Sequence, residues 1–196
     1  MELEKISEHQ IAKDIRANLE MILTENTWLL KQVNFTELAL LVNDIKSANR
    51  IFITAAGRSG FSMRSAAMRL MHLGLKVYFV GETITPAILK GDLLVAASAS
   101  GTTNTIVRAA EKAREVGALV VAISTQEDSL LSALADQVIL VPAAGKQDLE
   151  SSRSAQYAGS LFEQFLLLLM DSVFQSLWKL DGIQAVELWK RHANLE

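Results

Sequence analysis

Short, uninterrupted apolar runs alternate along this chain with segments of helical periodicity, and this alternation restricts the fold more than any other feature. The predicted strands are residues 50–55, 76–80, 93–97, 118–124 and 137–141. A strand that is apolar at consecutive positions is buried on both faces, which is typical of parallel sheets whose crossovers are helices. The sequence therefore predicts an α/β fold: a doubly wound, Rossmann-like, five-stranded parallel sheet flanked by helices.

Helices are predicted between the strands and at both ends of the chain. Apolar spacing places them at about 6–30, at 37–47, up to about 73, at 103–116 and at about 159–180. Thr36 is the predicted cap of the second helix. The apolar face of the last helix is broader than one sheet can cover, so we expect either a subunit interface or a deeply buried position for it.

The chain of 196 residues has the length of one domain with a full hydrophobic core. We expect N-terminal helices at about 5–48, an α/β core at about 50–142 and C-terminal helices at about 154–192. Residues 143–156, rich in Gly, Ser and Gln, form a predicted polar loop between the core and the last helices.

Composition and charge exclude several classes of function. The net charge is −3 and there is no basic block, so no nucleic-acid partner is expected. The absence of cysteine excludes disulfides, thiolate nucleophiles and Cys-bound metals, and it fits a reducing cytosol. The N-terminus lacks the layout of a signal peptide, and the most apolar stretch, 165–170, is too short to span a bilayer. We expect a cytoplasmic protein that does not bind membranes.

A segment rich in hydroxyl side chains follows the third predicted strand directly. Residues 98–105 read Ser-Ala-Ser-Gly-Thr-Thr-Asn-Thr, at the point where the strand gives way to a helix. Short hydroxyl donors, free backbone N–H groups and the positive end of a helix are what a phosphate dianion requires. The segment contains no Lys, so it is not a Walker-type loop. A Ser/Thr-rich turn that caps the helix explains these residues equally well.

The turn after the first strand, residues 55–60, carries a second group of polar residues. Its sequence matches A-x-G-x-x-G, and Glu82 follows the second strand where a ribose-binding acid would lie in a dinucleotide site. Ala55 replaces the first glycine, however, and Arg58 and Ser59 would crowd a pyrophosphate, so these residues argue against NAD. The alternative is that Ser59 joins the 98–105 segment in one anion pocket, because both turns lie at the carboxyl edge of the sheet.

Longer segments carry a family resemblance over nearly the whole chain. They are Gly-Arg-Ser-Gly-Phe at 57–61, Ala-Met-Arg-Leu-Met-His-Leu-Gly at 67–74, Gly-Glu-Thr-Ile-Thr-Pro at 81–86, Gly-Ser-Leu-Phe-Glu-Gln at 159–164 and His-Ala-Asn-Leu-Glu at 192–196. With these segments the chain resembles the 6-phospho-3-hexuloisomerases of the sugar isomerase (SIS) fold. The Met-Arg-Leu-Met-His and His-Ala-Asn-Leu-Glu segments are specific to that family, whereas the hydroxyl segment is shared by SIS domains in general.

The resemblance implies an SIS-type sheet and an isomerase that converts 3-hexulose 6-phosphate to fructose 6-phosphate through an enediolate. This reaction serves formaldehyde fixation in the ribulose monophosphate pathway. The resemblance also implies a homotetramer with sites near subunit boundaries and with no metal or organic cofactor. Two alternatives stay open: another SIS ketose- or aldose-phosphate isomerase, and a non-catalytic sugar-phosphate-binding SIS protein. Such sensors usually carry a DNA-binding domain, for which this chain has no room.

The resemblance also assigns binding residues. Ser98, Ser100 and Thr103 match the phosphate-binding positions of the SIS loop, and Ser59 matches the serine of the first turn. Gly57, Arg58 and Glu82 complete the expected binding set. Arg58 either neutralises phosphate or enediolate charge or pairs with Glu82, and Glu82 either contacts sugar hydroxyls or holds Arg58.

Three residues depart from the family pattern beside these positions. Ala55 and Ala99 replace glycines, and Thr102 replaces the usual glutamate. We expect these changes to affect specificity and rate more than phosphate binding.

Two further residues are the expected catalytic groups. The reaction takes a proton from C2 and delivers one to C3, and Glu163 matches the family's carboxylate at the start of an apolar helix, where partial burial suits a base. Without the resemblance, its position is typical of a solvated first-turn glutamate that complements the helix dipole. His192 matches the C-terminal motif and is expected to carry a proton at a hydroxyl or in ring opening, within its own subunit or across a boundary. His72 is expected to be a packed or interface residue.

Overall fold

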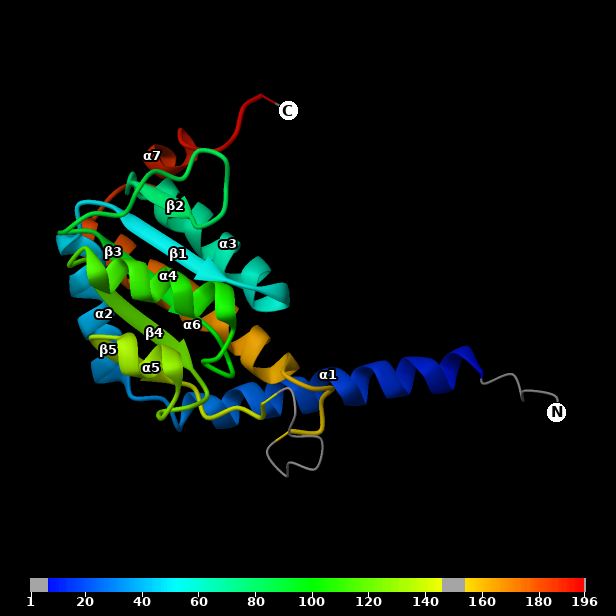
Figure 1. Ribbon diagram of the computed structural model, residues 1–196. Helices are drawn as coiled ribbons and strands as arrows, with labels where there is room; N and C mark the ends of the chain where they lie inside the picture. Colours follow the sequence, from blue (N-terminus) through cyan, green and yellow to red (C-terminus); the bar gives the residue numbers. More distant parts are fainter. Residues whose placement is uncertain (1–6, 146–153, 196) are drawn as a thin grey trace.

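The computed structural model describes residues 7–145 and 154–195 and has one parallel sheet at its centre (Figure 1). The five strands lie in the order β2-β1-β3-β4-β5. They are β1 (Ile51–Ala55), β2 (Val77–Phe79), β3 (Leu93–Ala97), β4 (Leu119–Ser124) and β5 (Gln137–Leu140). The predicted α/β class and all of the predicted strands are confirmed. From β1 the chain first adds β2 on one side and then β3 on the other, so the strand order reverses between β1 and β3.

Helices cover both faces of the sheet and extend beyond it. Their bounds are α1 (Glu8–Leu30), α2 (Phe35–Ser47), α3 (Gly57–His72), α4 (Asn104–Glu115), α5 (Leu130–Leu134), α6 (Ser160–Asp181) and α7 (Ala185–Trp189). One face of the sheet buries its core against α1, α2, α3 and α6. The other face packs against α4 and α5. In Figure 1 the N-terminal half of α1 projects away from this body.

Several predicted details of the helices differ from the structure. Asn34, not Thr36, caps α2, since its side chain accepts a hydrogen bond from the Thr36 N–H. The five-residue helix α5 was not predicted, because it is too short to show helical periodicity. The C-terminal helices end at Trp189 instead of residue 192. The predicted helix start at residue 5 or 6, and residues 146–153 of the predicted polar loop, lie outside the described residues.

The long helix α6 is mostly a core helix. Ten of its side chains are buried, and they pack against α3, α1 and α2. Two apolar side chains, Leu168 and Leu180, remain exposed on its surface. Within residues 7–145 and 154–195, neither α6 nor any other helix has the length and apolar character needed to cross a membrane.

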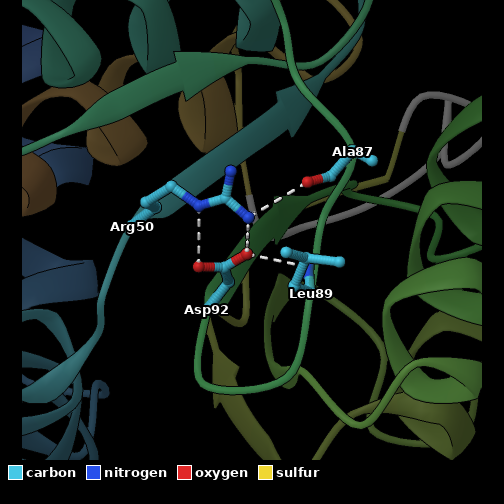
Figure 2. A network of polar contacts seen from close by, with 4 residues as sticks. All are labelled: Arg50, Ala87, Leu89 and Asp92. Carbon is cyan, nitrogen blue, oxygen red and sulfur yellow. Dashed lines mark hydrogen bonds and ion pairs between the residues drawn. The ribbon is translucent and has the colours of Figure 1, made fainter.

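A non-helical crossover connects β2 to β3, at residues 80–92, all of which are described. Asp92 and Arg50 hold this segment at the amino ends of β1 and β3 (Figure 2). The buried Asp92 carboxylate accepts from Arg50 Nε (3.0 Å), Arg50 Nη2 (2.5 Å) and the Leu89 N–H (2.8 Å). Arg50 Nη2 also donates to the Ala87 carbonyl (3.0 Å). Burial would raise the pKa of Asp92, but these bonds and the Arg50 charge outweigh it and lower that pKa.

Candidate active site

The carboxyl ends of β1 and β3 open into a pocket with a volume of about 880 Å³. This is the point where the strand order reverses, and ligands of doubly wound sheets bind at such points. The pocket is lined by five of the predicted binding residues: Gly57, Ser59, Ser98, Ser100 and Thr103. The two polar turns, more than thirty positions apart in the sequence, therefore share one site, as expected.

The hydroxyl groups of residues 98–103, which we call the phosphate loop, bond to one another. Ser98 Oγ lies 3.0 Å from Thr103 Oγ1, and Ser100 Oγ accepts from Thr102 Oγ1 at 3.0 Å and from the Thr102 N–H at 3.3 Å. Thr103 is the N-cap residue of α4, but its side chain makes no capping hydrogen bond with any described residue. Its hydroxyl bonds to Ser98 instead, so a simple capping role does not explain this residue.

Two helices begin at this pocket. The N-cap residue of α3 is Ala56, which has no capping group, and the first turn of α3 contributes Gly57 and the buried Ser59 to the pocket lining. The first N–H groups of a helix have no intrahelical acceptor, and together they carry about half a positive charge. With α4 beginning at Asn104, directly after its N-cap Thr103, two such helix ends lie beside the same cavity. This arrangement suits a bound anion.

Glycine is required at one turn of the phosphate loop. Gly101 has a φ of +62°, a left-handed conformation that residues with a Cβ rarely adopt. A Cβ at this position would also lie 2.0 Å from the Ser129 hydroxyl. The loop is therefore packed closely against the segment that follows β4.

Glu163 is buried, with 6% of its surface exposed. The solvated first-turn glutamate considered from the sequence is therefore wrong. Its Oε2 lies 3.1 Å from Arg58 Nη1, which also donates to Ser160 Oγ at 3.2 Å. The Ser62 hydroxyl donates to the Glu163 carbonyl at 2.9 Å, which joins α3 to the first turn of α6. A buried carboxylate with an arginine partner thus lies beside the first turns of α3, where Gly57 and Ser59 line the pocket, although Glu163 itself is not a lining residue.

Arg58 and Glu82 do not pair with each other, which corrects one of the two possibilities drawn from the sequence. Glu82 forms an ion pair with Arg64, one to two turns further along α3 than Arg58. The Arg64 guanidinium lies over the Phe79 ring at 3.9 Å from its centroid. Both partners of this ion pair are about half exposed.

His192 lies at the opposite end of α3 from Arg58. It follows α7 and stacks on His72, with ring centroids 4.0 Å apart. Its ring also contacts that of Trp189 in a tilted arrangement, with centroids 4.7 Å apart. A rise of 1.5 Å per residue places His72 roughly 21 Å from Arg58 along the α3 axis. Within one chain, the structure therefore separates the two expected catalytic residues, Glu163 and His192.

His72 is buried, as expected, and supports this C-terminal contact. The Arg191 guanidinium donates to its carbonyl at 2.9 Å. Burial lowers the pKa of His72, and the charges of His192 and Arg69 lower it further. The histidine pair is therefore part of the packing that holds the C-terminal segment on α3.

The pocket residues that follow β4 were not predicted from the sequence. Thr125, Gln126 and Asp128 also line the cavity, and Thr125 bonds directly to the phosphate loop. The signal was present, because the carboxyl end of a fourth parallel strand must meet the same sheet edge. Among the residues the structure describes, no group of three or more His, Asp or Glu side chains is placed to hold a metal ion.

Comparisons with known proteins agree on one family. The sequence model of the SIS domain matches residues 44–168. A relative from Mycobacterium gastri named 3-hexulose-6-phosphate isomerase is 49% identical over 95% of this chain and 94% of its own length. A Bacillus subtilis protein of the same name is 39% identical over 80% of this chain and 85% of its own.

A solved structure is similar over most of the chain. It is a Methanococcus jannaschii protein whose structure was reported to infer the function of a 3-hexulose-6-phosphate isomerase. It matches with a TM-score of 0.80 and 34% identity, over 92% of this chain and 99% of that one.

Proposed function

This chain belongs to the SIS domain family, and on that basis we propose that it is a 3-hexulose-6-phosphate isomerase, which forms fructose 6-phosphate. The observation that carries the proposal is the 49% identity, over 95% of the chain, to a relative of that name. The pocket at the β1/β3 switch point supports it, because it offers hydroxyl groups and two helix N-termini for a sugar phosphate.

The phosphate loop and Ser59 would hold the substrate by its phosphate group. Ser59, Ser98, Ser100 and Thr103 supply the hydroxyl donors, and the N-termini of α3 and α4 supply backbone N–H groups. A protein of net charge −3 attracts an anion through such local geometry and not through its overall field. Anchoring the phosphate places the carbons of the sugar in a reactive pose, which accounts for part of the rate.

Glu163 is the proposed base. Its carboxylate takes the proton from C2, which gives the enediolate with its charge on the C3 oxygen, and a proton added to that oxygen gives the enediol. The C2 hydroxyl then loses its proton, C3 gains one, and the carbonyl is left at C2. Arg58 supplies the opposite charge that the buried carboxylate needs, and its largely exposed guanidinium can also face the anionic substrate. Glu82, paired with Arg64, is proposed to contact sugar hydroxyls at the edge of the site.

His192 would serve the site of a neighbouring subunit. Its distance from Glu163 in one chain leaves a second copy as the source of the proton carrier. A homotetramer, proposed from the family resemblance, would provide that copy. In support, α1 carries an exposed apolar stripe at helical spacing, formed by Ile11, Ile15, Leu19 and Leu23.

We further propose a cytoplasmic enzyme of the ribulose monophosphate pathway. The names of the relatives support the pathway, since the product of the reaction is the pathway's fructose 6-phosphate, and the cysteine-free composition fits the cytoplasm.

The test of the base is Glu163→Gln, which keeps the shape of the side chain and removes its basicity. We expect turnover of 3-hexulose 6-phosphate to fall roughly 100-fold or more, with KM little changed. Glu115→Gln is the matched control, because this glutamate is exposed on α4 and pairs only with Lys112 among the contacts found for it. Near-normal turnover by the folded Glu163→Gln protein would contradict the assignment.

Complementation between two inactive variants tests whether His192 crosses a subunit boundary. Glu163→Gln and His192→Ala chains, each inactive alone, should regain activity when they are co-expressed and assemble together. Mixed assemblies that stay inactive would contradict a shared site.

A further inference from the structure

The carbonyl of Ala99, in the middle of the phosphate loop, accepts an unusual number of hydrogen bonds. Thr125 Oγ1 donates to it at 2.7 Å, the Thr125 N–H at 3.1 Å and Ser124 Oγ at 3.2 Å. Ser124 and Thr125 are both buried at the end of β4. Since a carbonyl oxygen has two lone pairs, three donors saturate it. The shortest of the three bonds comes from the Thr125 hydroxyl.

This contact fixes the orientation of one peptide group that faces the pocket. A trans peptide directs its C=O and the following N–H to opposite sides, and the described residues contain no cis bond. With the Ala99 carbonyl held against the end of β4, the Ser100 N–H points away from β4. No acceptor among the described residues takes this N–H, and Ser100 lines the cavity. The N–H is therefore free to bind an anion there.

Thr125 Oγ1 itself accepts a hydrogen bond, which leaves its hydroxyl proton for the Ala99 carbonyl. The Gln126 side-chain amide donates to Thr125 Oγ1 at 3.3 Å, which directs the hydroxyl proton toward Ala99. Ser124 Oγ is held in the same way: it donates to the Ala99 carbonyl and accepts from the Gln126 N–H at 3.1 Å. The end of β4 thus forms a rigid support behind the phosphate loop.

We propose that Thr125 is a positioning residue for phosphate binding, which rests on the proposed function of this pocket. The Thr125 hydroxyl holds the Ala99 carbonyl so that the Ser100 N–H is preorganised for the phosphate group. The bonds from the Thr125 N–H and from Ser124 Oγ to the same carbonyl would remain after a substitution of the Thr125 side chain. The loop would therefore keep its fold, but without its shortest bond the peptide group would be held less tightly.

The test compares Thr125→Val, which keeps the volume and removes the hydroxyl, with Thr125→Ser, which keeps the hydroxyl. We expect Thr125→Val to raise the KM for fructose 6-phosphate and the inhibition constant of inorganic phosphate roughly tenfold, with kcat within about threefold of wild type. Thr125→Ser should restore both constants. If Thr125→Val does not fold, Thr125→Ala removes the same hydroxyl and has the same expected result.

The matched control is Thr24→Val. The Thr24 hydroxyl donates to the Glu20 carbonyl at 2.7 Å, a bond of the same kind that lies on α1 and outside the pocket lining. This variant should change neither constant.

One result would overturn only the role of Thr125, and a different result would overturn only the proposed reaction. If wild type binds inorganic phosphate and folded Thr125→Val binds it equally well, the role of Thr125 is wrong and the isomerase proposal is untouched. If wild type does not isomerise 3-hexulose 6-phosphate but Thr125→Val still weakens phosphate binding tenfold, the proposed reaction is wrong and Thr125 keeps its role.

Discussion

The Arg50–Asp92 pair gives a prediction whose size follows from the structure. Asp92 is 2% exposed, and the Arg50 side chain is 21% exposed. Asp92→Asn removes the charge but keeps an oxygen that can accept the Leu89 N–H, while Arg50 keeps the Ala87 carbonyl and partial access to water. Hydrogen bonds to charged groups contribute about 1.5–3 kcal/mol each, so we expect a loss of about 2–3 kcal/mol in the free energy of unfolding at pH 7. For a chain of this length, that lowers Tm by roughly 4–12 °C.

Substituting the other partner of the pair should reduce the free energy of unfolding by more. Arg50→Met leaves the Asp92 carboxylate buried and without its cation, a change that typically costs about 3–5 kcal/mol. The double variant should cost less than the sum of the two single variants, because the second substitution removes the group that the first one leaves unpaired.

The lowered pKa of Asp92 also fixes the pH dependence. A carboxyl group whose pKa is lower in the folded state contributes stability above its unfolded pKa of about 3.9, and this contribution is lost as pH falls through the folded pKa. The difference in stability between wild type and Asp92→Asn should therefore be constant from about pH 5 to 8 and should shrink below about pH 4.

Urea unfolding at one fixed protein concentration, followed by circular dichroism, measures these free energies. Isomerase activity serves as the control and should not change. Asp92 precedes β3 and the phosphate loop follows β3, so this five-residue strand of about 17 Å separates the ion pair from the site. A cost below about 0.5 kcal/mol for Asp92→Asn, or a smaller cost for Arg50→Met than for Asp92→Asn, would refute this reasoning.

Other predictions concern the phosphate loop, the exposed helix and the buried histidine. Gly101→Ala forces an alanine into the left-handed conformation, which costs about 1–2 kcal/mol, at a site with no room for its Cβ. Tm should therefore fall in thermal melts, and the KM for sugar phosphate should rise more than tenfold in kinetic assays. Ile15→Asp places a charge in the exposed stripe of α1 and should lower the mass measured by light scattering without unfolding the subunit; an unchanged mass contradicts a role for α1 in assembly. Because burial and the charges of His192 and Arg69 lower the pKa of His72, the unfolded chain binds more protons than the folded one below about pH 6.5, so stability should fall as pH drops from 7 to 5. His72→Gln should reduce that slope in thermal melts.

The sheet and the position of the site followed from the sequence because both depend on local patterns. Apolar runs such as 93–97 identify buried parallel strands, and the carboxyl ends of such strands meet at one edge. That geometry alone predicts that Ser59 and the phosphate loop lie together. The carboxyl end of β4 meets the same edge, so Thr125 was predictable in the same way.

The side-chain partners could not be predicted in this way. Arg58 and Arg64 lie on the same helix, and the rotation of α3 against both α6 and the crossover after β2 decides which acid each one meets. That rotation depends on how the two helices pack, which no periodicity encodes. The contact of His192 with His72 likewise depends on where the chain turns after α6, at Gly182, whose positive φ ends that helix.

The proposed reaction is tested most directly by supplying purified protein with 3-hexulose 6-phosphate and measuring fructose 6-phosphate. Ribose, arabinose and glucosamine phosphates, assayed in parallel, show whether Ala99 and Thr102 have shifted the preference. We predict that fructose 6-phosphate forms and that 3-hexulose 6-phosphate has the highest kcat/KM of the compounds tested. A folded protein that yields no fructose 6-phosphate, or that prefers another sugar phosphate, would contradict the account.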